Sequence, residues 1–250
     1  MEIAQIATIA SKEFWDRIRN RWVLAVALVF TAFALTIAYF GAAQQGSIGL
    51  RSIDVTIASL VSLVIYLIPL IALILGFDAI VGERERGSLD LLLSMPITRL
   101  ELILGKFFGL AAALTFSTVA GFGLVAIMLS TQIDLNGLIH YFGFMLSSVL
   151  LGCAFLSLAV MLSVFAADRA RASGLAIAMW FFFVLVFDLL LANPADVFRI
   201  LNIFTLADVR TMYGLVTVFP PMLADPWLLG MVMVAWIVAP LGIATWRFRQ

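Results

Sequence analysis

The chain has very few residues of the kinds that bind metals or carry out acid–base catalysis. Its 250 residues include one cysteine, Cys153, and one histidine, His140. A single cysteine excludes an internal disulfide framework and a cysteine-based metal site, and one histidine leaves no His cluster for a metal and no catalytic triad. We therefore interpret Cys153 as a small packing residue and His140 as a structural or interfacial one.

Charged residues are scarce as well. They make up 12% of the chain, whereas hydrophobic residues make up 64%, and the mean hydropathy is +1.14. No soluble domain of this length has such a composition. Several apolar runs reach the roughly 20 residues that a helix needs to cross a bilayer, so we predict an all-α polytopic membrane protein. The N-terminus opens with Glu2 instead of a basic cluster, and the first long apolar run starts only at Trp22, so a cleavable targeting peptide is not expected.

A nucleotide-binding loop is missing too. Such a loop needs the pattern G-x-x-x-x-G-K followed by Ser or Thr. Of the two lysines, Lys12 has a serine before it, and Lys106 follows Gly105 but has Leu100 and Phe107 where the first glycine and the hydroxyl belong. The chain is therefore expected to bind no ATP and to have no catalytic residues of its own.

The apolar runs predict six membrane spans in a single domain. They cover about residues 22–42, 55–81, 103–130, 138–166, 172–192 and 227–246. Before them, residues 1–21 place apolar side chains on one helical face, namely Ile3, Ile6, Ala7, Ala10, Phe14 and Ile18. This pattern predicts an interfacial amphipathic helix whose basic end, Arg17, Arg19 and Arg21, meets lipid headgroups.

The distribution of lysine and arginine predicts the orientation. With the N-terminus in the cytoplasm, three of the 15 basic residues, Arg51, Arg199 and Arg210, lie outside and the other 12 lie inside. Loops rich in lysine and arginine stay on the cytoplasmic side. We therefore expect a multi-pass protein of the cytoplasmic (inner) membrane with both termini in the cytoplasm.

The stretch 82–109 is where the apolar sequence is most clearly interrupted. Four consecutive charges at 83–86 cannot lie in lipid cheaply, and the residues after them, Leu89, Leu92, Leu93 and Met95, recur at helical spacing. We predict a short amphipathic helix at 88–95 outside the bilayer, capped by Ser88 and ended by Pro96. Either a docking surface for a soluble partner or a solvated loop helix fits this pattern.

The third span has its own start signal and a favourable surface for packing. Thr98 and Glu101 have the spacing of a capping box, which predicts a helix beginning at Arg99. Gly105 and Gly109 form a small-xxx-small pair that lets two helices approach closely.

The longest outer segment, 193–226, also carries helix signals. Asn193, Pro194 and Asp196 fit a cap, a first-turn proline and an acid in the first turn, and a second start lies near Thr205. We predict two short helices that form an outer cap over the ends of the spans.

Two carboxylates, Asp78 and Asp188, lie within predicted spans, close to their ends. Ionisable residues in a membrane are costly, and either a structural ion pair or a place in a substrate or proton path explains them. Met212 and Met222 could contact Cu(I), which favours thioethers, but ten methionines in so apolar a chain are expected as packing residues. No metal site is predicted.

The arrangement resembles the membrane subunit, or permease, of ABC-2-type ABC transporters. The resemblance rests on six spans and on the motif G-S-L-x-x-L-L-x-x-P at 87–96, which corresponds to the coupling helix that docks on the ATPase subunit. The runs 52–109, 180–191 and 193–202 are similar to the branch of this family that serves the maturation of nitrous oxide reductase.

This resemblance implies partners and site residues. It implies a homodimer, two copies of a cytoplasmic ATPase (NosF-like) that holds ATP and Mg²⁺, and a periplasmic protein (NosD-like); no nucleic acid is expected. The positions that match the ATPase-docking element are Glu83, Arg84, Glu85, Gly87, Ser88, Leu89, Leu92, Leu93 and Pro96. Those that match the outer partner's contact are Asn193, Asp196, Arg199 and Asn202.

The resulting hypothesis is a permease that couples ATP hydrolysis in a separate subunit to the transport of copper or a sulfur species for the copper sites of nitrous oxide reductase. Three alternatives remain open. They are an ABC-2 exporter of another small or lipophilic molecule, a secondary transporter driven by protons through Asp78 and Asp188, and a passive scaffold that only anchors its partners.

Overall fold

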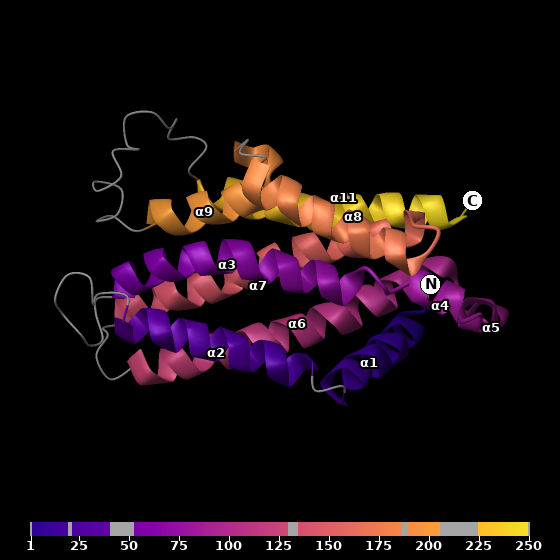
Figure 1. The fold of residues 1–250 in the computed structure, drawn as a ribbon, viewed down its shortest axis with the longest axis horizontal. Helices are drawn as coiled ribbons and strands as arrows, with labels where there is room; N and C mark the ends of the chain where they lie inside the picture. The colour runs from indigo at the N-terminus through magenta and orange to yellow at the C-terminus, as the bar shows by residue number, and fades with distance from the viewer. Residues whose placement is uncertain are drawn as a thin grey trace.

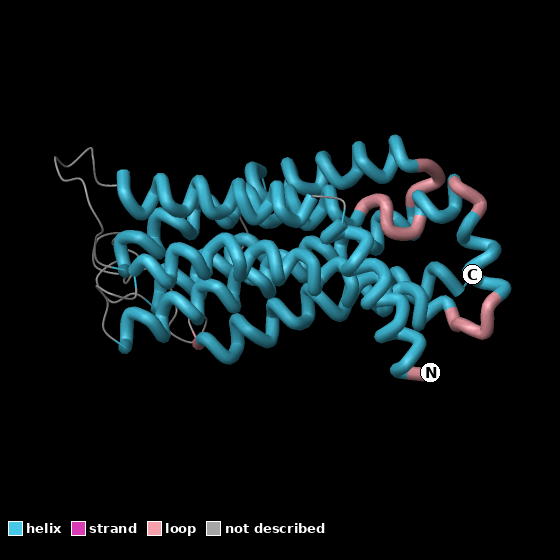
Figure 2. Tube along the Cα trace, turned by 90° about the horizontal axis from the view of Figure 1, so that it is seen from below, coloured by secondary structure: helices cyan, strands magenta, loops and turns pink. Residues whose placement is uncertain are grey.

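A computed structural model describes residues 2–19, 22–40, 53–129, 135–186, 190–205 and 225–249, and every regular element within these ranges is a helix. Figures 1 and 2 show that the long helices run side by side along one axis, with both termini at one end of the bundle (Figure 2 is turned by 90° from Figure 1). The α-helices are α1 (Ile3–Arg19), α2 (Trp22–Phe40), α3 (Ile53–Gly76), α4 (Val81–Glu85), α5 (Ser88–Ser94), α6 (Arg99–Leu129), α7 (Leu135–Phe165), α8 (Arg169–Phe181), α9 (Pro194–Thr205) and α11 (Pro226–Arg249). A π-helical segment, η2 (Phe182–Val186), and a 3-10 turn, η3 (Leu190–Ala192), follow α8.

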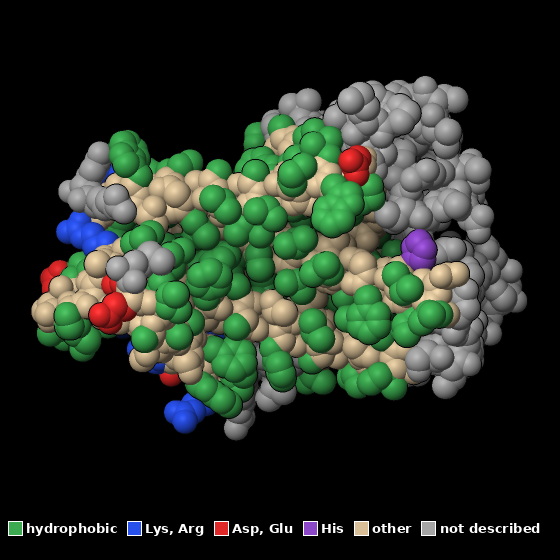
Figure 3. Space-filling view, turned by 180° about the vertical axis from the view of Figure 1, so that it is seen from behind, with side chains coloured by type: hydrophobic (Ala, Val, Ile, Leu, Met, Phe, Trp, Pro, Cys, Tyr) green, Lys and Arg blue, Asp and Glu red, His purple; other side chains and the backbone are tan. Residues whose placement is uncertain are grey.

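Within the described residues, each of the six predicted spans overlaps helical segments. Among the described residues, five stretches are long and apolar enough to cross a membrane, namely Ser59–Glu85, Arg99–Ile127, Leu135–Phe165, Arg169–Val186 and Pro226–Phe248. The remaining predicted span is α2, whose 19 residues extend about 28 Å, close to the ~30 Å of a hydrocarbon core. Figure 3 shows apolar side chains over the middle of one face and most of the visible charged ones at one end, which we call the charged end.

The centre of the bundle is α7, around which α3, α6, α9 and α11 pack. Its side chains include Tyr141, Phe144 and Phe155, which are fully or almost fully buried. The Phe144 ring packs against Phe122 of α6 and Phe198 of α9. This arrangement makes α7 the helix that most other spans share as a neighbour.

Buried serines of α7 also form hydrogen bonds with backbone groups of neighbouring segments. These backbone groups lack a partner in their own helix because a proline or a turn interrupts it. Pro240 of α11 has no N–H to donate to the carbonyl of Trp236, four residues earlier. The Ser157 hydroxyl lies 2.9 Å from that carbonyl oxygen and 2.7 Å from the carbonyl oxygen of Ala154 in its own helix, and its one proton is shared between the two acceptors. Because lipid offers no hydrogen bonds, this contact removes a cost that the proline would otherwise impose.

A second serine performs the same task where α3 ends. The chain turns at residues 77–80, and the Ser163 hydroxyl oxygen accepts hydrogen bonds from the amides of Ile80 and Val81 at 2.9 and 3.0 Å. Ser163 thereby holds the segment directly after α3 against the last turn of α7.

The predicted glycine pair forms a close helix contact, and its partner is α1. A Cβ added to Gly105 would lie 2.6 Å from Cβ of Ile9, and one added to Gly109 would lie 2.6 Å from the carbonyl oxygen of Ala10. Neither distance is possible for a larger residue without displacing α1. The sequence 105–109 therefore seats the N-terminal helix on the first turns of the third span.

The outer-cap prediction needs a correction. α9 packs among α3, α7 and α11 instead of lying over their ends, and Val197 and Phe198 are fully buried. The polar residues of α9 can be buried because they have internal partners: Asn202 donates to the Ser147 hydroxyl of α7 at 2.9 Å. The second predicted helix, together with Asp188, Met212 and Met222, lies outside the described residues.

Candidate functional site

The tip of the charged end is the connecting segment, residues 77–98, which joins α3 to α6 and contains α4 and α5 (Figure 1). Gly87 separates the two short helices and has a φ of +71°, a left-handed conformation that glycine adopts without a steric penalty. α5 covers Ser88–Ser94, where the sequence predicts 88–95, and Met95 before Pro96 is extended.

The prediction that Ser88 caps α5 is wrong. The cap position is occupied by Gly87, and Ser88 lies inside the first turn. Its hydroxyl donates to the carboxylate of Glu83, and the carbonyl oxygen of the same residue also lies within 3.2 Å of it. Ser88 therefore ties α5 back to α4.

The capping box at the start of α6 is confirmed. The Thr98 amide donates to Oε2 of Glu101 at 2.8 Å, and the Glu101 amide donates to the Thr98 hydroxyl oxygen at 3.2 Å. α6 begins at Arg99, as predicted. The other carboxylate oxygen of Glu101 accepts from the backbone amide of Glu2 at 2.6 Å, so the same residue also binds the start of α1.

α4 is fixed to the end of α7 by Arg84. One guanidinium nitrogen donates to the carbonyl oxygen of Ala166 at 2.9 Å, and the other donates to that of Val164 at 3.3 Å. The last carbonyls of a helix have no partner within it, and Arg84 supplies one.

α8 is joined to the connecting segment by a two-pronged ion pair. Nε of Arg169 lies 2.7 Å from Oδ1 of Asp78, and Nη2 donates to Oδ2 at 2.8 Å. The Arg169 amide also donates to the carboxylate of Glu85 at 2.7 Å. Gly82 leaves room for this arrangement, because a Cβ there would lie 2.2 Å from Oδ1 of Asp78. Asp78 therefore has the structural ion pair that was one of its two predicted roles.

A buried lysine connects three elements at the same end. Nζ of Lys106 on α6 lies 3.1 Å from Glu13 of α1 and 3.0 Å from Glu83 of α4, and the exposed fractions of the three side chains are 5%, 11% and 14%. Arg17 and Arg86 make longer contacts with the two carboxylates, at 3.3 and 3.9 Å. Sequence reasoning missed this network, although a lysine inside an apolar span is a signal for a buried carboxylate partner.

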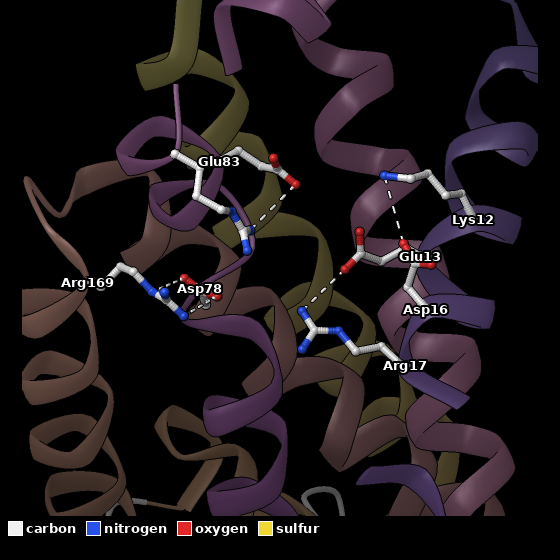
Figure 4. Close-up of a pocket in the computed structure, with 8 residues that line it drawn as sticks. Lys12, Glu13, Asp16, Arg17, Asp78, Glu83 and Arg169 are labelled. Atoms are coloured by element: carbon white, nitrogen blue, oxygen red, sulfur yellow. Dashed lines mark hydrogen bonds and ion pairs between the residues drawn. The ribbon is translucent and has the colours of Figure 1, made fainter. Parts of the chain in front are cut away.

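These ion pairs border a cavity of about 530 Å³ (Figure 4). Its lining has equal numbers of basic and acidic side chains, namely Lys12, Arg17, Arg86 and Arg169, and Glu13, Asp16, Asp78 and Glu83. Figure 4 shows Arg169 directed at Asp78 on one side and the α1 residues on the other. Among the described residues, no group of three or more His, Cys, Asp or Glu could hold a metal ion. The chemistry of this site is therefore ion pairing between elements.

The outward surface of α5 differs from the predicted one. Leu89 is buried, and Leu92 and Leu93 are half-buried against the core, whereas Leu91 is 68% exposed and Met95 56% exposed. Leu91 was absent from the predicted docking set. The signal was in the sequence, because Leu89, Leu92 and Leu93 share the inner face and a leucine at 91 must point the other way.

The other predicted docking residues lie around this surface and mostly bind the rest of the chain. Glu83, Arg84, Glu85 and Ser88 make the internal contacts given above, and Pro96 is exposed at the end of the helix. Docking remains a prediction for this set.

The four predicted outer contacts lie on or next to α9, and three of them are buried. Asn193 accepts from the Ala195 amide at 2.9 Å, capping α9, and Asp196 pairs with Arg199 at 3.3 Å. Asn202 meets α7. The Arg199 side chain is 41% exposed, so of these four residues it offers the accessible surface for an outer partner.

Comparison with known proteins assigns the family. Residues 7–250 match the model of the ABC-2 family transporter proteins. The chain belongs to this family. It is 42% identical over 270 residues to the probable ABC transporter permease protein NosY of Pseudomonas aeruginosa, covering 97% of each chain. It is 40% identical over 271 residues to the protein of the same name from Stutzerimonas stutzeri, covering 98% of each. This ABC-2 permease is an integral multi-pass membrane protein, and membership implies a partner ATPase subunit.

Proposed function

We propose that the ATPase subunit docks on α5. The observation that supports this most directly is the exposure of Leu91 on α5, whose other leucines are packed inward, and of Met95 directly after the helix. The two apolar side chains stand among charged residues at the tip of the molecule, away from the apolar band that lipid would cover. Exposed apolar groups with a polar rim are typical of protein–protein interfaces.

The contacts behind α5 suit a coupling role. The connecting segment binds α7 through Arg84, α8 through Asp78 and Glu85, and both α1 and α6 through the Lys106 network. A displacement of α5 by the ATPase therefore acts on the charged ends of several spans. The partner binds ATP and Mg²⁺, and this chain contributes the mechanical link between two conformations and binds no cofactor.

The proposed cargo is copper or a sulfur species used in building the copper sites of nitrous oxide reductase. The proposal is supported by the 40–42% identity to proteins named NosY over nearly the whole chain. The working assembly would be a homodimer with two NosF-like ATPases in the cytoplasm and a NosD-like protein outside, where Arg199 is accessible. The concentration of basic residues at the charged end supports placing both termini in the cytoplasm, in the inner membrane.

The docking test is Leu91→Asp in the tagged permease, co-expressed with the ATPase. We expect the ATPase to be lost on purification while the permease stays folded, because a carboxylate would replace the main apolar contact. Leu135→Asp is the matched control: Leu135 is 73% exposed but lies at the opposite end of the bundle. Retention of the ATPase at wild-type stoichiometry by the Leu91 variant would show that docking occurs elsewhere.

The Arg169 ion pair weighs against a proton-driven transporter that uses Asp78. The Asp78 carboxylate oxygens lie 2.7 and 2.8 Å from the Arg169 guanidinium, so this side chain already links α8 to the connecting segment. Transport that depends strictly on an added ATPase would exclude this alternative.

A further inference from the structure

α8 makes close polar contacts at its first residue, at the charged end of the bundle, but buries few side chains along the rest of its length. Its first residue, Arg169, binds both Asp78 and Glu85 of the connecting segment, at 2.7–2.8 Å. Along the helix only Ala172 and Ala176 are buried. The contrast with α7, which neighbours enclose on most sides, means that few packing contacts oppose a tilt of α8.

The upper end of α8 is an irregular point. The hydrogen-bond pattern changes to that of a π-helix at Phe182–Val186, a change often found at functional sites and at kinks. The side-chain amide of Asn193 donates to the carbonyl oxygen of Phe183 at 2.7 Å, and its oxygen accepts from the Ala195 amide at 2.9 Å. One side chain thus joins η2 to the first turn of α9.

Trp180, two residues before this segment, lies near the middle of the membrane. Trp180 is 11 residues beyond Arg169, about 16 Å along a helix, and its indole N–H donates to the carbonyl of Tyr66. Tyr66 in turn is ten residues before Gly76, about 15 Å from the end of α3. Half of a hydrocarbon core is also about 15 Å. Figure 1 shows α8 reaching from the charged end to the middle of the bundle, with α9 beside the far half.

We infer that α8 is the lever that carries movement of the connecting segment into the membrane, and that it bends at the π-helical segment, where Asn193 is the positioning residue. The inference rests on the proposed ATPase docking. Pulling on Asp78 and Glu85 moves the base of α8, whereas α9 stays in place because it is buried among α3, α7 and α11. A few residues at the end of an element absorb the change of direction, as in other hinge motions.

Distances between spin labels test this movement in the complex with its ATPase. One label pair joins α8 to α6 (Leu175→Cys with Leu124→Cys) and the other joins α9 to α6 (Arg199→Cys with Leu124→Cys), in a Cys153→Ala background. Trapping ATP in the ATPase should shift the α8 distance and leave the α9 distance unchanged. Equal shifts in both pairs, or none in a complex that hydrolyses ATP, would overturn the lever.

A second test uses the permease alone and so does not depend on docking. Asn193→Ser retains a good helix cap for α9 but cannot reach the Phe183 carbonyl. We expect the label at Leu175 to become more mobile while the label at Arg199 is unchanged. Asn202→Ser, which removes the other buried asparagine of α9, is the control and should leave the Leu175 label as it is.

An unchanged Leu175 label in the Asn193 variant would refute its positioning role. Loss of ATPase binding in the wild-type complex would instead contradict the docking proposal, so the two failures are distinguishable.

Discussion

At the residue scale, single serine hydroxyls stabilise the fold by hydrogen-bonding backbone groups that lack a helical partner. In lipid, such a backbone group cannot form a hydrogen bond with water instead. Ser157 binds one backbone carbonyl of α11, and Ser163 binds two backbone amides after α3. In a soluble protein these contacts would exchange for water at a modest cost. Inside a membrane, the free-energy cost of losing them approaches that of burying an unpaired polar group in an apolar medium.

Ser157→Ala should therefore destabilise the permease by about 1–3 kcal/mol, because the Trp236 carbonyl loses its donor where Pro240 provides none. Unfolding in detergent micelles, followed by tryptophan fluorescence, measures the change. Ser173→Ala is the control, since its hydroxyl only contacts Ala170 in its own exposed helix. Equal stability of the two variants would contradict the role assigned to Ser157.

Lys106→Met is expected to cost more, about 3–5 kcal/mol, because it leaves the carboxylates of Glu13 and Glu83 together without their shared cation. Lys12→Met provides the comparison. The Lys12 ammonium lies 3.8 Å from Asp16 and its side chain is 68% exposed, so its loss should cost less than about 1 kcal/mol. The same unfolding measurement applies, and similar losses in both variants would argue against a buried network.

At the scale of elements, sequence signals within one helical turn predicted where helices begin and end. They did not predict which helices pack against each other. The Thr98–Glu101 capping box and the pre-proline Met95 act within one helical turn, so their outcomes follow from local chemistry. The Gly105 and Gly109 pair indicated a close contact but could not name α1 as its partner, because the pattern describes one surface only.

Other features depend on which helices become neighbours. α9 has the signals of a surface cap, and only the partners that α7 offers, such as Ser147 for Asn202, explain why it lies inside the bundle. The Lys106 network joins residues that are 93 and 23 positions apart, beyond the reach of any local pattern. The sequence alone indicates that Leu91 is exposed, because its position on the helical wheel lies opposite the inward-facing leucines of α5.

Gly109→Ala tests the seat of α1. The added methyl group would overlap the backbone of α1, so we expect the helix to separate from α6. A maleimide reporter at Ile6→Cys, a position buried at this contact, should then react faster. Gly123→Ala on the same helix is the control, because nothing lies within 4 Å of its added Cβ. An unchanged reaction rate in the Gly109 variant would show that α1 does not need the close approach.

At the scale of the whole molecule, the charged end and the far end should lie on opposite sides of the membrane. Ser94→Cys on α5 and Leu135→Cys at the start of α7 are exposed reporters for the two ends. In intact cells that carry Cys153→Ala, an impermeant maleimide should label the Leu135 reporter alone, and permeabilisation should expose the Ser94 reporter. Labelling in the reverse order would invert the orientation that we propose.

The contact between Ser163 and the amides of Ile80 and Val81 spans 83 and 82 positions of the chain. During synthesis the turn after α3 therefore emerges long before the helix that completes it. Until the fourth span has entered the bilayer, these two amides lack the Ser163 oxygen as a partner. The permease thus acquires a finished connecting segment only once α7 has been inserted, so an ATPase that recognises its final shape would select chains whose central helix is already in place.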